Sequence, residues 1–297
     1  MVGTLASDIG EYVIVADVVE TLAYKYGVRD AVSNPELKSR IKKLEAELYA
    51  KMKEMVTPNL TVKIIEAADL AERILSVCNK IDPDAVIVCL DRSYFPDKLH
   101  VNPTAEFGNK IVAHYNFPSL TTEADKIEAE LKGRAVLNGG LASSIILVDT
   151  GINEGDTLTK IIRLLEIRGV KISGIVSGLT SDRGKDKLQK AFKHEITSIE
   201  PATWRKWTDG RDLFLIDGPL PPERLRSNVR EFIPITDAID EDSRSFIRDE
   251  MKERFKELCA LGNTRLFSTL KEFGIDTKVI GEHISIETIK KRSLAIR

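Results

Sequence analysis

The side chains best placed for chemistry follow two apolar runs. Residues 145–148 are all apolar and lead directly into Asp149, and residues 85–90 lead into Asp91 and Arg92. Such runs are typical of buried parallel strands. After Asp149 a glycine-containing segment precedes a predicted helix, and the first turn of a helix presents unpaired backbone N–H groups that bind anions. The pattern therefore predicts a site for an anionic ligand at the carboxyl ends of two strands.

The segment around Asp149 resembles the phosphoribosyl pyrophosphate (PRPP) motif of type I phosphoribosyltransferases. In that motif four apolar residues precede two acids, two apolar residues, Thr-Thr-Gly, one variable residue, a threonine and an apolar residue. The chain matches this spacing without a gap from Ile145 to Leu158, as Ile-Ile-Leu-Val-Asp-Thr-Gly-Ile-Asn-Glu-Gly-Asp-Thr-Leu. The resemblance implies that Asp149 holds the ribose hydroxyls and Mg²⁺. It also implies substrate and phosphate contacts from the following loop residues and from the end of the first strand: Ser93, Thr150, Gly151, Asn153, Glu154, Gly155, Asp156 and Thr157.

The chain departs from the family pattern at several of these positions. Thr150 replaces the second acid, and Asn153 and Glu154 replace the paired threonines. Because a threonine carries no charge, we expect weaker metal and ribose binding than in the family. An ionised glutamate accepts hydrogen bonds and donates none, so Glu154 should repel a phosphate dianion. The alternative is that Gly151 and Gly155 only form a turn between a strand and a helix.

Other candidates lie outside the motif. Arg92 is the natural pyrophosphate ligand, because a guanidinium fork matches phosphate oxygens, although a loop-capping surface arginine is the alternative. The family has a mobile hairpin in the region of residues 120–143, which implies that Lys132 and Arg134 close over the reacting centre; a solvated basic pair is the alternative. Trp204 and Trp207 resemble the base-stacking tail of purine-salvage members, unless they seal the edge of the sheet.

The elements that must position these residues follow from periodicity and capping signals. Asn34 and Pro35 predict the start of a long amphipathic helix, whose apolar stripe faces a core, a dimer seam or a partner helix. We expect further helices at 65–80, 105–115, 156–168 with Gly169 as its C-terminal cap, 243–261 and 264–273. We expect strands at 85–90, 145–149, 170–176, 213–216 and 277–281. Residues 178–184 and a Lys-rich helix should complete the third strand-helix unit.

The amino-acid composition favours some classes of protein over others. The 297 residues are 42% hydrophobic, with 44 Lys and Arg against 46 Asp and Glu, so no overall charge favours nucleic acid or membrane. Cys78, Cys89 and Cys259 have no paired spacing and suggest reduced core residues. No apolar stretch approaches a membrane span, and the N-terminus lacks the pattern of a secretion signal. We therefore expect a cytoplasmic protein.

These observations predict an α/β protein with a parallel-sheet core similar to type I phosphoribosyltransferases. The expected regions are a helical or mixed extension at 1–82, the core at 83–217 and a mostly helical extension at 218–297. The two extensions should form one mixed subdomain or an oligomer interface, in a homodimer. The four histidines share no metal-ligand spacing, and the Gly-x-Ser-x-Gly, P-loop and Gly-x-Gly-x-x-Gly patterns are missing.

The resemblance implies transfer of the phosphoribosyl group from PRPP to a purine or another nitrogenous base, with Mg²⁺ as cofactor and pyrophosphate as product. The alternative, from a different class, is a sensor or regulator that keeps the fold and binds PRPP or a nucleotide without turnover. The loss of the second acid at Thr150 and the presence of Glu154 favour this alternative.

Overall fold

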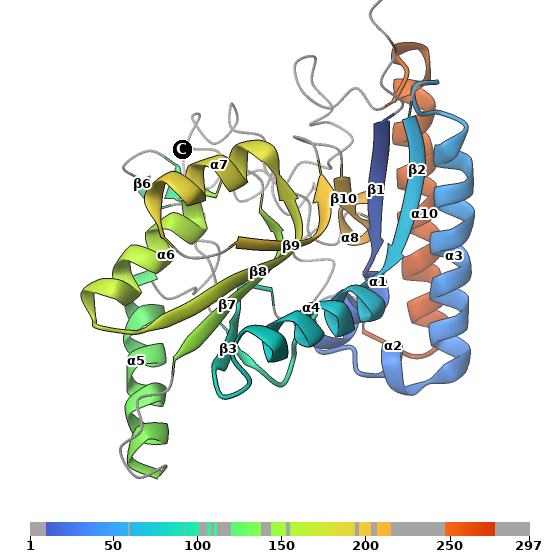
Figure 1. Ribbon diagram of the computed structural model, residues 1–297. Coiled ribbons are helices and arrows are strands. Elements are labelled where there is room, and N and C mark those ends of the chain that lie inside the picture. The colour runs from blue at the N-terminus through green and yellow to red at the C-terminus, as the bar shows by residue number, and fades with distance from the viewer. Residues whose placement is uncertain are drawn as a thin grey trace, which may run out of the picture. The chain divides into compact units, whose positions relative to one another are not determined.

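The computed structural model divides the chain into two compact units (Figure 1). One comprises Met1–Ala67 with Arg205–Arg297, and the other comprises Ala68–Trp204. We expected boundaries after residues 82 and 217. The structure describes residues 10–58, 60–91, 93–100, 106–107, 110–111, 120–137, 144–152, 155–193, 196–202, 207–214 and 247–276. The central unit comprises residues 68–204, and the terminal unit comprises residues 1–67 and 205–297.

The central unit is built on a five-stranded parallel sheet with the order β4-β3-β7-β8-β9. Its strands are β3 (Val86–Cys89), β4 (Leu99–His100), β7 (Ile145–Ile152), β8 (Ile172–Ser181) and β9 (Ile196–Ala202). Numbered along the chain, these strands have the order 2-1-3-4-5, which is a doubly wound arrangement with its switch point between the first and third strands. The expected adjacency of residues 85–90 and 145–149 is confirmed, because Val86 pairs with Ile145 and Cys89 with Val148.

Helices cover both faces of this sheet. On one face α5 (Leu120–Leu137), α6 (Asp156–Ile167) and α7 (Asp182–Ala191) share a single apolar core with alternate residues of the strands, such as Leu147 and Ile175. On the other face α4 (Ala67–Ile81) packs so closely that a Cβ at Gly178 of β8 would lie 2.8 Å from Leu70. The structure thus confirms an α/β architecture of parallel strands flanked by helices.

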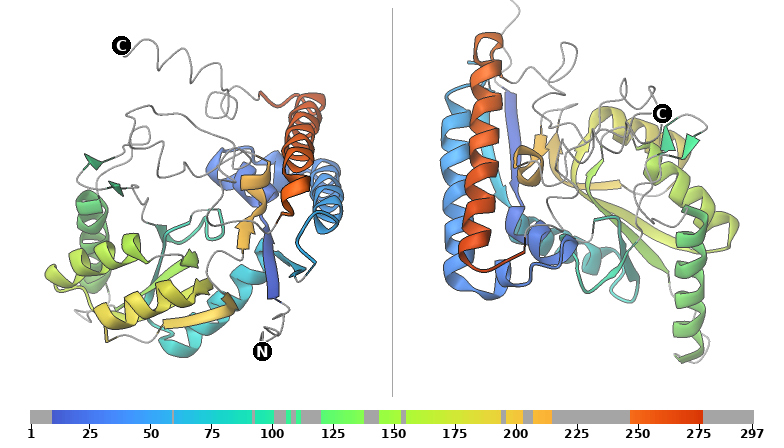
Figure 2. Two further views of the ribbon diagram at one scale, coloured as in Figure 1. Left: turned by 90° about the horizontal axis from the view of Figure 1, so that it is seen from above. Right: turned by 180° about the vertical axis from the view of Figure 1, so that it is seen from behind.

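The terminal unit has its own parallel sheet, with the order β10-β1-β2. Its strands are β1 (Gly10–Ala16), β2 (Leu60–Glu66) and β10 (Trp207–Asp209). The long helices α3 (Pro35–Lys53) and α10 (Lys252–Glu272) lie side by side (Figures 1 and 2). Shorter elements complete the unit: α1 (Val18–Glu20), the π-helical turn η1 (Thr21–Lys25), α2 (Asp30–Ser33), α8 (Gly210–Leu213) and the 3₁₀ turn η2 (Asp249–Met251).

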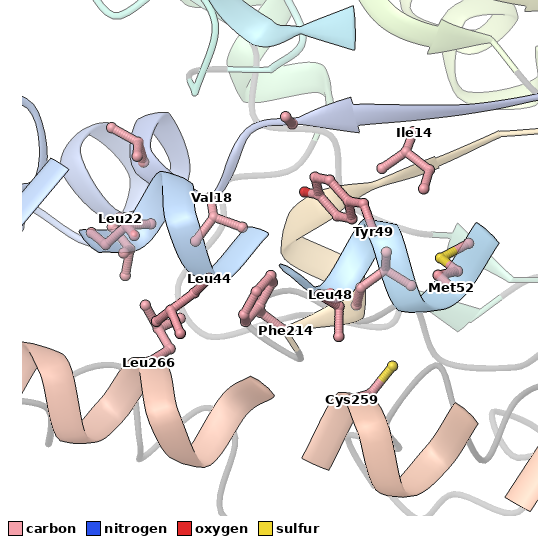
Figure 3. Packing of buried hydrophobic residues seen from close by; sticks show 14 of the residues in the cluster. Ile14, Val18, Leu22, Leu44, Leu48, Tyr49, Met52, Phe214, Cys259 and Leu266 are labelled. Atoms are coloured by element: carbon pink, nitrogen blue, oxygen red, sulfur yellow. The ribbon is translucent and has the colours of Figure 1, made fainter. Parts of the chain in front are cut away.

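Residues from both ends of the chain form the core of this unit (Figure 3). Ile14 of β1, Leu44 and Leu48 of α3, Phe214 after α8 and Leu266 of α10 belong to one buried cluster. Segments from the N-terminal and C-terminal regions thus share one core, as expected, but α4, which lies within the expected N-terminal extension, belongs almost entirely to the central unit. The predicted cap of α3 is also confirmed, because the Asn34 Oδ1 accepts from the backbone N–H groups of Glu36 and Leu37 at 3.1 and 3.2 Å.

Several expected elements are wrong in the region between β4 and β7. The helix expected at 105–115 does not form, because β5 (Glu106–Phe107) pairs antiparallel with β6 (Lys110–Ile111). The intervening Gly-Asn sequence is typical of a tight hairpin turn, and this signal was overlooked. The hairpin expected in 120–143 is instead helix α5, whose buried residues Ala124, Ile127 and Leu131 recur at helical spacing.

Other boundaries also differ from expectation. Strand β8 continues to Ser181, so most of the loop expected at 178–184 is strand. Leu213 ends the helix α8 rather than starting a strand, and the helices expected at 243–261 and 264–273 are one helix, α10, with Gly262 inside it. Strands β1 and β2 were not anticipated, although β1 is an apolar run. The strand expected at 277–281 lies outside the described residues.

Candidate functional site

The candidate site lies at the switch point of the central sheet, where β3 and β7 end beside each other. Asp91 follows β3, and Asp149 and Thr150 lie near the end of β7. The Thr150 hydroxyl donates a hydrogen bond of 3.4 Å to Oδ2 of Asp91. Polar side chains from two non-consecutive strands thus meet at the edge where doubly wound sheets bind ligands. The sequence identified Asp149 and Thr150 as site residues, whereas it treated Asp91 only as the end of a strand.

Backbone groups hold both carboxylates in place. Oδ1 of Asp91 accepts from the backbone N–H of Ser93 at 2.9 Å, and Oδ1 of Asp149 accepts from the backbone N–H of Gly151 at 3.4 Å. The Ser93 side chain is buried, as are the aromatic residues that follow it. These local turns hold each carboxylate beside its own backbone and explain why short polar residues stand at both strand ends.

The carboxylates at this edge of the sheet affect the pKa of the neighbouring Cys89. Burial raises the pKa of its thiol to about 12, and the carboxylates of Asp91 and Asp149 add to the increase. The S–H group lies 3.8 Å from the carbonyl oxygen of Phe95. A thiol in this environment stays protonated at neutral pH, so Cys89 is a core residue rather than a nucleophile. This agrees with the expectation from its apolar surroundings.

Helix α6 begins at the same edge, after a glycine in the left-handed conformation. Gly155 has φ 72° and is the N-cap of α6. Because glycine has no side chain, the cap residue offers no side-chain acceptor to the first N–H groups of the helix. A Cβ at Gly155 would lie 3.3 Å from the carbonyl oxygen of Gly184, because the start of α6 packs against the first turn of α7. This geometry requires glycine and is compatible with an anion at the helix terminus. Asn153 and Glu154 lie outside the described residues.

The acid in the first turn of α6 has a counter-charge. Asp156 is exposed and forms an ion pair and hydrogen bond with Lys187 of α7. The carboxylate of Asp156 would otherwise repel an anion at this helix terminus by about 1 kcal/mol or more, depending on screening. Lys187 was not selected from the sequence, since a lysine within a Lys-rich helix has no distinguishing signal there. Thr157 is the next residue of α6 and is partly exposed.

The end of β8 contributes two hydroxyl groups. Ser181 caps α7 by accepting a hydrogen bond of 2.9 Å from the backbone N–H of Gly184. The Thr180 hydroxyl is buried and has no hydrogen-bond partner among the described residues. Buried hydroxyls are usually paired, so Thr180 is a candidate ligand contact that sequence reasoning missed.

The other residues predicted from the sequence have not been brought together with these groups by any described contact. Lys132 is an exposed residue of α5 and pairs with Glu128 at 2.5 Å, so it does not belong to a closing hairpin. Arg134 is also on α5, and its side chain lies outside the described residues, as do Arg92 and Trp204. Trp207 belongs to the terminal unit, where β10 pairs it with Val13. Its role in base stacking stays a prediction.

The carboxylate oxygens at this edge fit Mg²⁺ only if a bound substrate supplies further oxygen ligands. Within the described parts of the chain, no three His, Cys, Asp or Glu side chains lie close enough to hold a metal. Asp91 and Asp149 supply carboxylate oxygens from adjacent strands. Mg²⁺ is commonly held by one or two carboxylates plus substrate phosphates and water, so two acids at this edge fit a metal that arrives with a pyrophosphate.

Comparison with known proteins gives no assignment. No family model matches the chain, and no curated protein matches it. In the regions that the structure describes, no helix combines the length and apolar character needed to cross a bilayer.

Proposed function

We propose that the central unit is a phosphoribosyltransferase-like domain that binds PRPP with Mg²⁺ and transfers its phosphoribosyl group to a nitrogenous base such as a purine. The observation that carries the proposal is the hydrogen bond from Thr150 to Asp91, next to Asp149 in the same strand, at the switch point of a 2-1-3-4-5 parallel sheet. Ligands of doubly wound sheets bind at this position. The PRPP-like spacing of residues 145–158 runs through the same strand end and the start of α6.

The proposed roles follow from the chemistry of each group. Asp149 would accept hydrogen bonds from the ribose hydroxyls. Asp91 and Asp149 would hold Mg²⁺, which would supply positive charge to the pyrophosphate. The N–H groups at the start of α6 bind the 5-phosphate. The ion pair between Lys187 and Asp156 reduces the repulsion that Asp156 would exert on this phosphate.

In the reaction, the lone pair of a ring nitrogen forms a bond to ribose C1 while the bond from C1 to the pyrophosphate oxygen breaks. The electrons of that bond leave with the pyrophosphate, and the nitrogen passes its proton to solvent. The transition state resembles an oxocarbenium ion. Such a reaction needs positioning and electrostatic stabilisation rather than a protein nucleophile.

Binding without turnover is the second candidate, and two observations favour it. Thr150 is neutral and donates its hydrogen bond to Asp91, so it does not supply a second ribose-binding carboxylate. Residues 120–137 form helix α5 where the resembled family has a closing hairpin, and Lys132 is engaged with Glu128 on its exposed surface. Within residues 120–137, the helix supplies no such hairpin to close over the site and exclude water.

Isothermal titration calorimetry with PRPP and Mg²⁺ tests the proposal. Asp149→Asn and Asp91→Asn should each weaken binding by roughly tenfold or more, because each removes a charge at the metal and ribose positions. Asp69→Asn is the matched control, since Asp69 is an exposed acid on α4. Its affinity should equal that of the unaltered protein.

A second assay separates the two candidates. Pyrophosphate release is measured with a panel of purine and pyrimidine bases under the conditions in which PRPP binds. Release that depends on one base supports transfer, whereas binding without release supports the regulator. If the unaltered protein does not bind PRPP, or if all three variants bind it equally, both candidates are refuted.

A further inference from the structure

Three glutamates gather around one lysine at the carboxyl edge of the terminal unit's sheet. Nζ of Lys42 on α3 lies 3.3 Å from Oε2 of Glu45 and 2.7 Å from Oε2 of Glu66, at the end of β2. The carboxylate of Glu20 on α1 acts electrostatically on both Lys42 and Glu45. Lys38 also acts electrostatically on Glu20, so two ammonium groups face three carboxylates. The cluster therefore holds excess negative charge beside the buried Glu45, although Glu66 and Lys42 are partly exposed.

Glu45 is the most deeply buried member, with 1% of its surface exposed. Its Oε1 accepts hydrogen bonds from the Tyr49 hydroxyl at 3.0 Å and from the backbone N–H of Val18, the first residue of α1, at 3.3 Å. Glu45 thus links α3 to the turn between β1 and α1. Both of these hydrogen bonds are on one oxygen of the carboxyl group, whereas Oε2 has only the ion pair with Lys42 within the part of the chain that the structure describes.

The second oxygens of two glutamates are left without hydrogen bonds. Among the described residues, Oε2 of Glu45 and Oε2 of Glu20 are both buried and accept no hydrogen bond, although Lys42 lies within ion-pair distance of the former. A buried carboxylate oxygen without a donor is costly, and two mutually repelling carboxylates increase that cost. A proton on one of them would remove a charge and create a donor.

Other charged groups near Glu45 do not offset this excess. Arg211 of α8 is paired with Asp17 at 3.2 Å and with Asp209 at 2.8 Å, so its charge is shared by two other carboxylates. The titratable and charged groups that face Glu45 from the surrounding elements are Lys42 and Tyr49 on α3, Glu20 on α1, Glu66 on β2, Asp17 after β1 and Arg211 on α8.

We propose that Glu45 binds a proton in the neutral pH range, and that this proton removes a buried charge where α3 packs on the turn between β1 and α1. Burial raises the pKa of Glu45 to about 7, although Lys42 and the hydrogen bonds from Tyr49 and Val18 oppose the increase. Burial also raises the pKa of Glu20. Burial alone would lower the pKa of Lys42, but the carboxylates of Glu45, Glu20 and Glu66 raise it, so the lysine stays charged.

The proton makes the terminal unit sensitive to pH in a defined direction. The pKa of Glu45 is higher in the folded protein than the ordinary value of 4.5, so the folded state binds this proton more tightly than the unfolded state. Stability is therefore greatest below the ordinary pKa and falls as the pH rises through about 7. The contact between α3 and the start of α1 should loosen under mildly alkaline conditions.

Carbon-13 NMR of the full chain, labelled at the glutamate carboxyl carbons, tests the proposal. One resonance should titrate near pH 7 and should be absent from the Glu45→Gln variant, in which the amide keeps an acceptor and adds a donor. Glu47→Gln is the matched control on the same helix. The Glu47 carboxylate accepts a hydrogen bond from Arg265, which lowers its pKa, so this variant should lose only a resonance that titrates in the acid range. Titration of all glutamates below about pH 5.5 would refute the proposal.

Hydrogen exchange measured by mass spectrometry provides the second readout. After correction for intrinsic rates, α3 of the unaltered protein should lose protection by roughly tenfold between about pH 6 and pH 8, and Glu45→Gln should show no such loss. Peptides from β7 and β8 are the internal reference. Recovery of protection at the higher pH on adding Mg²⁺ or Ca²⁺ would identify a cation site instead of a proton site and overturn the proposal.

Discussion

Gly178 of β8 is the position at which one added methyl group should most directly disturb the candidate site. A Cβ there would lie 2.7 Å from the carbonyl oxygen of Thr150 and 2.8 Å from Cδ2 of Leu70. Both distances are shorter than real Cβ contacts. The Leu70 side chain is fully buried, and the Thr150 oxygen belongs to the backbone of the adjacent strand, so neither neighbour moves at low cost.

The expected loss of stability for Gly178→Ala follows from these contacts. Overpacking a well-packed core costs about 1 to 3 kcal/mol. The substitution also lowers the conformational entropy of the unfolded chain, which offsets about 0.4 to 1 kcal/mol of this loss in stability. A net loss of about 1 to 2 kcal/mol remains, equivalent to roughly a 5- to 30-fold change in the folded-to-unfolded ratio. Displacement of the Thr150 backbone should also weaken its side-chain hydrogen bond to Asp91.

Native-state hydrogen exchange is the suitable assay, because peptides from β7 and α6 report on the central unit alone. Gly133→Ala is the control, since no atom lies within 4 Å of its added Cβ and Gly133 is inside helix α5. This control should gain stability by up to about 1 kcal/mol. Unchanged protection of β7 in Gly178→Ala would refute the packing of β8 against Thr150 and Leu70.

Three further substitutions have definite expected outcomes. Asn34→Ala should destabilise the terminal unit by about 1 kcal/mol in urea unfolding, with Asn34→Ser close to the original stability, because only the alanine removes the cap of α3. Arg211→Met should cost about 3 kcal/mol or more in thermal unfolding, since it removes the guanidinium from the buried Asp17; a loss below about 1 kcal/mol would contradict this ion pair. Gly155→Ala should cost more than Gly169→Ala in the same assay, because both glycines have φ 72° but only Gly155 has close neighbours; equal losses would mean that backbone strain accounts for the whole effect.

Local signals in the sequence were enough for the elements that depend on nearby residues. The apolar run before Asp149 predicted β7, Asn34 and Pro35 predicted the start of α3, and Gly169 predicted the end of α6. In each case the determining interaction joins residues a few positions apart, such as a cap hydrogen bond or a left-handed glycine. The Gly-Asn sequence between β5 and β6 is also a local signal, but the surrounding residues were interpreted as a helix.

The candidate site was only partly predictable for the same reason. Asp149 and Thr150 follow an apolar run and match a motif, so the sequence identified them directly. Asp91 acquires its importance from the hydrogen bond with Thr150, which lies 59 positions away in the chain. Lys187 becomes relevant only through its pair with Asp156, 31 positions away. Such contacts depend on strand order and helix placement, for which one sequence has no direct signal.

By itself, the sequence determined that this chain forms an α/β protein. It also determined that a strand ending in an acid is followed by a glycine-containing segment and a helix. Both predictions were possible because hydrophobic periodicity and capping act over a few residues. Tertiary structure alone decided the 2-1-3-4-5 order of the central sheet and the pairing of β10 with β1 in the terminal unit. It also decided that Glu45 is buried beside Glu20, Glu66 and Lys42. Burial and the distances between charges arise from packing between distant segments, and these two quantities set the protonation and binding properties of the protein.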